Sequence, residues 1–317
     1  MADVKKIATR ESYGNALKEL GAENNKVVVL DADLAEATKT QIFKKAYPER
    51  HFDCGIAEAN MMCVAAGLAS AGLVPFASTF AMFAAGRAFE QIRNTIGYPH
   101  LNVKIGATHG GISVGEDGAS HQCCEDFALM RSIPGMIVMC ASDDMEAKKM
   151  VRAAAETEGP VYMRFCRLAT PMFHTEDYDF TIGKAEVLRE GTDVAIIANG
   201  ILVSEAMEAA NILASEGISA HVINMHTIKP LDRDAVIDAA KRCGTIITAE
   251  EHNIIGGLGE AVAACTAENY PAKVIRIGVN DEFGHSGPAA ALLQSFGLTA
   301  ENIVNKAKAA VGAGADC

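Results

Sequence analysis

Short apolar runs alternate with longer amphipathic or alanine-rich stretches along the first half of the chain. The runs are rich in β-branched residues and predict buried strands at 26–34, 101–109, 135–143 and 161–165. The other stretches predict helices at 11–22, 60–72, 84–96 and 144–159. Strands that are apolar throughout and separated by helices are typical of parallel sheets covered on both faces, so this half is expected to form an α/β domain.

The alternation is interrupted once and then resumes. Residues 168–183 contain proline, aromatic and acidic side chains and predict a linker. From 193 to 279 strand-like and helix-like segments alternate again, which indicates a second domain of normal size. The predicted fold class is therefore α/β with two domains, each a mostly parallel sheet flanked by helices, at 1–180 (with the linker at its end) and 184–317.

Composition excludes several classes of function. The chain has 317 residues and a net charge of −12, so no basic surface is expected for nucleic acid or an anionic membrane. Residues 1–14 lack an apolar signal region, and no apolar run is long enough to span a bilayer, which predicts a cytoplasmic protein. The nine cysteines are scattered without a C-x-x-C pair. Neither a zinc cluster nor a disulfide framework is expected, and the chain is predicted to hold no metal itself.

The stretch ATHGGISVGEDGASHQ, at 107–122, concentrates glycines and ionisable side chains directly after a predicted strand. Ligands of open α/β sheets bind at the carboxyl ends of the strands, and glycines let a backbone approach a ligand closely. His109, Asp117 and His121 are therefore candidate site residues. The alternative, that the glycines only shape turns and the histidines are solvated, stays open at this point.

Glu58 begins the predicted apolar helix within GIAEANMMCVAAGLASAG, at 55–72, and no basic residue is close to it in sequence. A glutamate in the first turn of a helix is favoured by the helix dipole alone. Alternatively, its carboxyl group is held in an apolar setting to hydrogen-bond or protonate a buried ring nitrogen. The spacing does not decide between the two.

Five motifs together resemble transketolase, in the order of that family and with roughly its spacing. They are DADL at 31–34, GIAEANM at 55–61, STFAMF at 78–83, THGGISVGEDGASHQ at 108–122 and EEHNIIGGLG at 250–259. The resemblance covers nearly the whole chain and implies a pyrimidine-binding domain at 1–180 and a transketolase C-terminal domain at 184–317. The family binds thiamine diphosphate through a divalent metal held in another domain by a G-D-G motif and a downstream asparagine. This sequence contains no G-D-G.

The resemblance therefore implies the C-terminal subunit of a split, two-subunit transketolase. A separate N-terminal subunit would hold the diphosphate and its metal, Mg or Ca, and two copies of each subunit would form the enzyme. The chain alone is expected to be inactive. We also expect small apolar residues at 59–72 and 79–93 to form an exposed surface through which the isolated chain self-associates.

The resemblance assigns the cofactor-binding residues. Glu58 matches the glutamate that hydrogen-bonds the aminopyrimidine ring and promotes its imino tautomer. Phe80 and Phe83 match aromatic residues around the pyrimidine, with Phe83 expected to stack on it, although two core phenylalanines would give the same pattern. Asp33 matches an aspartate near the thiazolium ring, whose positive charge a carboxylate favours.

The glycine-rich stretch then corresponds to the substrate channel. His121 matches a histidine close to the reacting carbonyl and hydroxyl groups of the donor, suited to proton transfer. Asp117 matches a residue that binds a sugar hydroxyl, and His109 matches one at the acceptor end and its phosphate. Where many transketolases have Asp-Ser, this chain has Gly110 and Gly111. That change removes polar groups from the channel, so the acceptor can differ from the usual pentose phosphates.

Two arginines match those that hold the sugar phosphate, Arg10 and Arg167, because a guanidinium group binds phosphate in a bidentate manner. An ordinary surface arginine remains an alternative for Arg10. Arg164 competes with Arg167 for the role, but on a continued strand the two side chains would face opposite sides. Where a serine often helps to hold the phosphate, this chain has Ala37.

The predicted reaction is transfer of a two-carbon ketol unit from a ketose phosphate to an aldose phosphate. Two relatives offer alternatives: the β subunit of a 2-oxo-acid dehydrogenase decarboxylating component, and deoxyxylulose-phosphate synthase. They carry His-Ser-Gln and His-His-Gly at the channel position, whereas Gln122 here follows His121, which favours transketolase. A degenerate subunit without activity would be expected to lose at least one of Glu58, His109, Asp117 and His121. The Gly-Gly-Leu-Gly at 256–259 lacks the spacing of a dinucleotide loop and is interpreted as structural.

Overall fold

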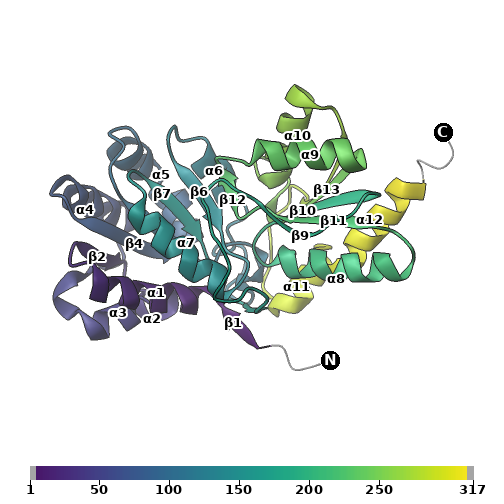
Figure 1. The fold of residues 1–317 in the computed structure, drawn as a ribbon. Helices are drawn as coiled ribbons and strands as arrows, with labels where there is room; N and C mark the ends of the chain where they lie inside the picture. The colour runs from purple at the N-terminus through teal and green to yellow at the C-terminus, as the bar shows by residue number, and fades with distance from the viewer. Residues whose placement is uncertain (1–4, 313–317) are drawn as a thin grey trace.

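A seven-stranded sheet forms the centre of the N-terminal domain in the computed structural model, which describes residues 5–312 (Figure 1). Its order is β12-β6-β7-β5-β4-β2-β3, and every neighbouring pair is parallel except β12 with β6. The strands are β2 (Val27–Asp31), β3 (His51–Asp53), β4 (Val74–Phe80), β5 (Lys104–Thr108), β6 (Ile137–Cys140), β7 (Val161–Arg164) and β12 (Thr227–Lys229). The carboxyl ends of the six parallel strands therefore lie along one edge of the sheet.

Helices cover both faces of this sheet, because alternate residues of each strand point to opposite sides. One face packs on α1 (Thr9–Glu23), α3 (Gln41–Ala46) and α7 (Asp144–Glu156). The other packs on α4 (Glu58–Ser70) and α6 (Asp126–Arg131). Short helices α2 (Ala35–Thr38) and η1 (Pro48–Arg50) complete the connections between β2 and β3. The predicted parallel sheet with helices on both faces is confirmed.

The helix predicted at 84–96 is wrong in its detail. Two π-helical segments, η2 (Met82–Arg87) and η3 (Ile92–Gly97), flank the three-residue α5 (Phe89–Gln91). The small residues of this segment lie buried at Ala81, Ala84, Ala85 and Ala88. That spacing of three and four residues is the inward face of a helix. The stretch 79–93 therefore exposes Arg87, Glu90 and Arg93, not the expected apolar surface, whereas α4 does expose Cys63, Val64 and Gly67.

The C-terminal domain has a five-stranded sheet in the order β14-β13-β10-β11-β9, with β9 antiparallel to β11 and the other pairs parallel. Its strands are β9 (Glu186–Arg189), β10 (Val194–Ala198), β11 (Ala220–Asn224), β13 (Thr245–Asn253) and β14 (Lys273–Val279). One face is covered by α8 (Leu202–Ser215), α11 (Ala289–Ser295) and α12 (Ala300–Gly312), and the other by α9 (Arg233–Cys243) and α10 (Leu258–Asn269) (Figure 1).

The predicted linker at 168–183 begins as a strand. Within it, β8 (Ala169–Pro171) pairs antiparallel with β1 (Lys6–Ala8), and the residues after β8 have no regular structure. The edge strand β12 comes from the C-terminal half of the chain but pairs with β6 of the first sheet. The two domains thus share a sheet edge, and the boundaries at 180 and 184 remain a prediction.

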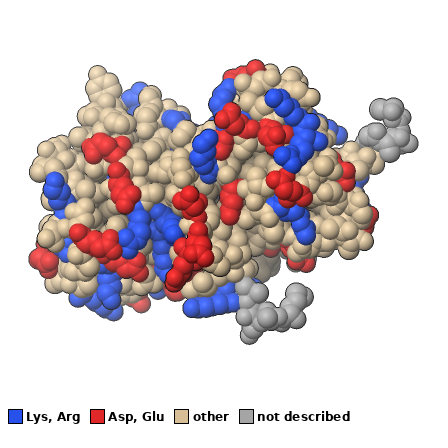
Figure 2. Space-filling model, viewed as in Figure 1, with Lys and Arg blue, Asp and Glu red and all other residues tan. Residues whose placement is uncertain are grey.

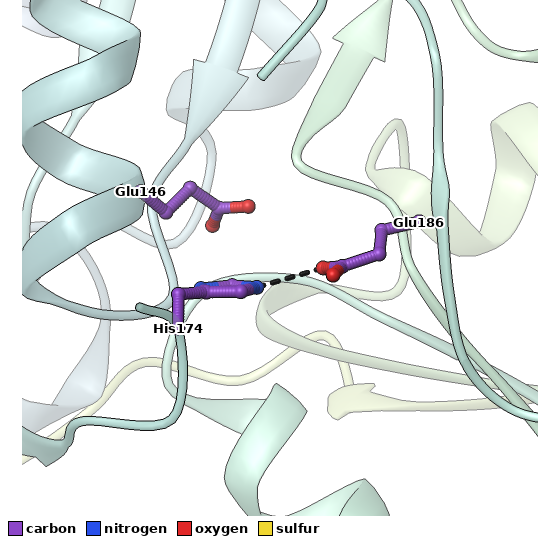
Figure 3. Close-up of side chains that lie close together, drawn as sticks. All are labelled: Glu146, His174 and Glu186. Carbon is purple, nitrogen blue, oxygen red and sulfur yellow. Dashed lines mark hydrogen bonds and ion pairs between the residues drawn. The ribbon is translucent and has the colours of Figure 1, made fainter. Parts of the chain in front are cut away.

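A charged clamp fixes the linker between the domains. His174 lies on the linker, with its Nδ1 3.0 Å from Asp143 Oδ1. Its Nε2 is 2.7 Å from Glu186 Oε2 (Figure 3). Burial opposes a charge there, but the hydrogen bonds to the two carboxylates prevail and raise the pKa of His174 to about 9. The imidazolium thus joins the N-terminus of α7 to β9.

Glu146 lies beside this clamp, and Glu146, His174 and Glu186 are close enough together to hold a metal ion. The Glu146 carboxylate already accepts hydrogen bonds from the side chains of Ser142, Tyr178 and Asn224 and from the Ser142 backbone. A metal would have to displace these donors and also the proton on His174. The cluster is therefore best described as an ion-pair clamp.

Acidic and basic side chains are interspersed on the face shown in Figure 2, without an extended basic patch there. The most exposed large apolar side chains are Tyr98, Phe283 and Ile56, at 89%, 88% and 77% exposure. No helix between residues 5 and 312 combines the length and hydrophobicity that crossing a membrane requires.

Candidate functional site

The predicted site residues gather at the carboxyl edge of the first sheet. Asp33 follows β2, Glu58 follows β3, Phe80 ends β4 and His109 follows β5. These strands are consecutive in the order β5-β4-β2-β3. This is the edge at which open α/β sheets bind their ligands.

Glu58 is the first residue of α4 and is 1% exposed. Its Oε2 accepts a hydrogen bond of 2.8 Å from Arg87 Nη1 at the end of η2. Arg87 is 29 residues away along the chain, so it is not a neighbour of Glu58 in the sequence. In the described part of the chain, no other side chain donates a hydrogen bond to this carboxylate.

Aromatic rings connect Glu58 to the glycine-rich stretch. The Arg87 guanidinium lies 4.6 Å from the centre of the Phe83 ring, which stacks on Phe80 at 5.7 Å. Phe80 in turn stacks on His109 with ring centres 3.8 Å apart, and the Phe83 ring meets His121 edge-on at 5.3 Å. Phe80 is buried and Phe83 is partly exposed, so Phe83 is the ring available for stacking on a ligand.

His109 is held in one orientation. Its φ is +57°, and its Nε2 lies 3.1 Å from Arg10 Nη1, while Nδ1 lies 2.9 Å from Thr108 Oγ1. Because a guanidinium only donates, Nε2 must accept, and the proton resides on Nδ1. Burial lowers the pKa of His109 to about 3, with the nearby charges of Arg10 and Arg167 acting in the same direction. This histidine is therefore neutral.

The three candidate arginines, Arg10, Arg164 and Arg167, differ in their contacts and in their burial. Arg10 also donates to the Ala37 carbonyl at 3.0 Å, so the backbone of Ala37 contacts the guanidinium where a serine hydroxyl is absent. Arg167 donates to the Val114 carbonyl and lies 3.8 Å from Asp117. Arg164 is buried, and its Nε is 3.4 Å from Asp126 Oδ2. Of the two competing arginines, only Arg167 therefore lies at the solvent-exposed part of the stretch.

Asp33 is the predicted site residue whose side chain is not joined to the others. It is exposed, has a φ of +61°, and its backbone N–H donates to Asp53 Oδ1. Within residues 5–312 its side chain forms no hydrogen bond or ion pair with another predicted site residue. The buried acid on this strand is its neighbour Asp31, whose Oδ2 lies 2.7 Å from His51 Nε2.

The chemistry of this edge fits one end of thiamine diphosphate. A buried carboxylate beside a partly exposed phenylalanine ring suits an aminopyrimidine, which has both ring nitrogens and flat apolar faces. Between residues 5 and 312, the one group of three or more histidine, cysteine or acidic side chains with the spacing of metal ligands is Glu146, His174 and Glu186, away from this edge on and beside the linker.

Known proteins resemble this chain over both of its domains. Residues 5–172 match the family model "Transketolase, pyrimidine binding domain", and residues 183–303 match "Transketolase, C-terminal domain". The chain is 50% identical to a "Putative transketolase C-terminal section" of Methanocaldococcus jannaschii, with 94% of each covered. It is 43% identical to a "6-deoxy-6-sulfo-D-fructose transketolase subunit" of Clostridium sp. strain MSTE9, covering 94% of this chain and 92% of that one.

Longer relatives match only in part: the chain is 39% identical to mouse transketolase and spans 50% of its length. Among solved structures, a "Split gene transketolase, inactive beta4 tetramer" superposes with a TM-score of 0.91 at 54% identity, covering 96% of this chain and 99% of that one. The chain therefore belongs to the transketolase family of thiamine-diphosphate enzymes and corresponds to the C-terminal section of a split transketolase.

Proposed function

We propose that this chain is the C-terminal subunit of a two-subunit transketolase that transfers a two-carbon ketol unit between sugar phosphates. The proposal depends above all on the continuous path of contacts from Glu58 through Arg87 and Phe83 to His121. Through one aromatic ring and one arginine, this path joins a carboxylate suited to a cofactor to a histidine suited to a substrate. Thiamine diphosphate, when bound, would supply the nucleophilic carbon that attacks the ketose carbonyl.

The surroundings of Glu58, Phe80 and Phe83 support the cofactor-binding roles proposed for them. Glu58 exchanges a proton with a ring nitrogen of the pyrimidine, and Arg87 fixes the carboxylate through Oε2, which leaves Oε1 for the ring. Phe83 stacks on the pyrimidine, and the Phe80 ring stacks on Phe83. Asp33 is assigned to the neighbourhood of the thiazolium ring, where its charge would be favourable.

On the substrate side, His121 is assigned proton transfer at the donor hydroxyl and Asp117 a hydrogen bond to a second hydroxyl. His109 is neutral, and its two ring nitrogens are hydrogen-bonded to Arg10 and Thr108. It therefore orients Arg10 and does not act as an acid. Arg10 and Arg167 bind the terminal anion of the sugar. A sulfonate would suit the same two guanidinium groups, and the Clostridium relative is named for a sulfo-sugar.

A separate N-terminal subunit, in two copies with two copies of this chain, would supply the metal, Mg or Ca, and the diphosphate site. Two observations support this. Ile56 and Val64, close to Glu58 in the chain, are 77% and 37% exposed, as expected of a surface that a partner covers. The solved relative consisting of β chains alone is described as inactive.

The test is to combine the purified chain with the N-terminal subunit of the same organism and to assay ketol transfer. The panel would contain pentose and hexose phosphates, a 6-deoxy-6-sulfo-ketose and a 2-oxo acid. Transfer that requires both subunits is the expected result. Oxidative decarboxylation of the 2-oxo acid would instead favour the dehydrogenase alternative. Submicromolar, metal-dependent binding of thiamine diphosphate to the chain alone, measured by calorimetry, would refute the need for a partner.

A further inference from the structure

The loop formed by residues 109–122, called here the substrate loop, has little capacity to hold its own shape. Four of its residues are glycines, and apart from a single turn of 3₁₀ helix at Ile112–Val114 it has no regular structure. Gly111, Gly115 and Gly118 all have positive φ. A loop of this kind keeps one conformation only if other parts of the protein bind its backbone.

Two buried charged side chains contact the start of the substrate loop. A Cβ atom on Gly110 would lie 1.8 Å from Nε of Arg164, and one on Gly111 would lie 2.3 Å from Cδ of Glu251. Only glycine permits both approaches. The Gly-Gly pair therefore has a physical reason beyond the loss of polar groups: it admits Arg164 from β7 and Glu251 from β13.

Glu251 belongs to the C-terminal domain yet binds the loop directly. Its Oε1 accepts a hydrogen bond from the backbone N–H of Ser113, in the 3₁₀ turn. The side chain is buried, and Arg164 is the cation that offsets the burial of its charge. Arg164 also donates to the Cys123 carbonyl at 3.0 Å, just after the loop.

The far end of the loop is bound in a similar way. Gln122 donates to the carbonyls of Ile112 and His285, at 3.1 Å and 3.0 Å. His285 lies in the C-terminal domain, after β14. Both ends of the loop are therefore bound to the second domain, and Asp117 and His121 lie between these points.

We propose that Glu251 is a positioning residue: its hydrogen bond to Ser113 sets the conformation of the substrate loop and so the placement of Asp117 and His121 against the sugar. The identity of the sugar in this inference rests on the proposed function. The hydrogen bond between Glu251 and Ser113 does not depend on it. The second domain then takes part in substrate recognition without carrying a residue that touches substrate.

The test uses the complex of this chain with its N-terminal subunit. Glu251→Ala removes the acceptor, and the loss of one hydrogen bond to a charged group corresponds to about a tenfold rise in KM for the acceptor sugar. Glu251→Gln keeps an amide oxygen and should recover most of the affinity. A purely structural role would reduce the active fraction, which lowers kcat and leaves KM unchanged.

Glu250→Gln is the matched control. Glu250 is the adjacent buried residue of β13, but it accepts from the N–H groups of Leu258 and Gly259 at α10 and not from the loop. Burial raises the pKa of Glu250 to about 7, so its neutral isostere is a mild change. We expect the wild-type KM for this variant.

Hydrogen exchange of the peptide spanning 109–122 provides a readout besides activity. Exchange in this peptide should quicken in Glu251→Ala and not in Glu250→Gln. Unchanged exchange, or faster exchange with an unchanged KM, would overturn the proposal. If Glu251→Ala does not fold, the isosteric Glu251→Gln carries the same comparison with a smaller expected effect, about threefold in KM. If the wild-type complex transfers no ketol unit, the proposed function fails, and exchange still decides whether Glu251 fixes the loop.

Discussion

Replacing Glu58 by glutamine separates a cofactor-activating carboxylate from a merely structural one. The side chain is buried at the start of α4, and glutamine keeps its size and its ability to accept from Arg87. It cannot donate or accept the proton that a ring nitrogen exchanges with a carboxyl group. We therefore expect Glu58→Gln to assemble with the N-terminal subunit and to lose turnover.

The structure supplies the two magnitudes to compare. The Arg87 side chain is 51% exposed, so solvent screens its ion pair with Glu58, and the pair is worth about 0–1 kcal/mol. Loss of the charge at the helix N-terminus adds about 0.3–1 kcal/mol. Loss of a positioned acid typically lowers a rate by about two to four orders of magnitude, or about 3–5 kcal/mol of barrier. The effect on rate should therefore clearly exceed the effect on stability.

The assay is proton–deuterium exchange at the thiazolium carbon of the bound cofactor, with complex formation checked by size-exclusion chromatography. Glu268→Gln is the control, since it breaks a similar ion pair, 2.9 Å from Arg233, in the exposed surface of the second domain. The control should exchange at the wild-type rate. If the assembled Glu58→Gln complex also does so, Glu58 is not the activating group and the cofactor assignment is wrong.

Three further predictions concern the chain by itself. His174 has a folded-state pKa of about 9, above its ordinary value near 6.5, so its contribution to stability is complete below about pH 6.5 and is lost as the pH rises through about 9. Urea unfolding at these two pH values should show a decline that is smaller in His174→Gln; an equal decline would contradict the clamp. Gly110→Ala should destabilise the fold by about 1–3 kcal/mol because its Cβ would collide with Arg164, whereas Gly67→Ala, with open space around its Cβ, should be neutral or stabilising. Finally, the chain should self-associate in sedimentation, and Tyr98→Ser, at its most exposed large apolar residue, should weaken that association.

The sequence predicted most of the fold because its strands are buried and uniformly apolar. Strands β2, β5, β6 and β7 lie within their predicted ranges. Strand β4 was not predicted, since Val74–Phe80 contains a proline, an alanine, a serine and a threonine and resembles a loop in composition. Its pairing with β2 and β5 on both sides overrides this weak local preference.

The π-helical turns and the shared sheet edge could not be predicted, because both depend on packing. The spacing of buried residues at 82–97 predicts a helix and does not distinguish α from π turns. The segment packs on α4 and on β4 of the sheet. Strand β12 has only three residues, and it pairs with β6 only because the chain returns from the second domain to the first. No local pattern carries that information.

At the site, the sequence names residues whose chemistry suits a ligand, and it misses residues that bind to them, such as Arg87 and Glu251. Arg87, for example, is ordinary in its local context and becomes informative only when η2 brings it to Glu58. Glu251 lies within a recognised motif, but the motif gives no sign that its carboxylate reaches a loop 138 positions earlier in the chain. Periodicity reports which face of an element is buried, and it does not report the distant partner of a buried charge.

The charge pattern of the substrate loop explains why a second domain is needed beside it. Asp117 and Arg167 lie close together at its exposed side, where solvent screens their attraction and cannot fix a backbone made largely of glycine. Arg164, Glu251 and Asp126 lie behind the loop and are buried, so their interactions are stronger and leaving any one unpaired would be costly. The buried set can therefore define one loop conformation where the exposed pair cannot. Because Glu251 comes from the second sheet, the second domain supplies one of the buried charges that hold this loop.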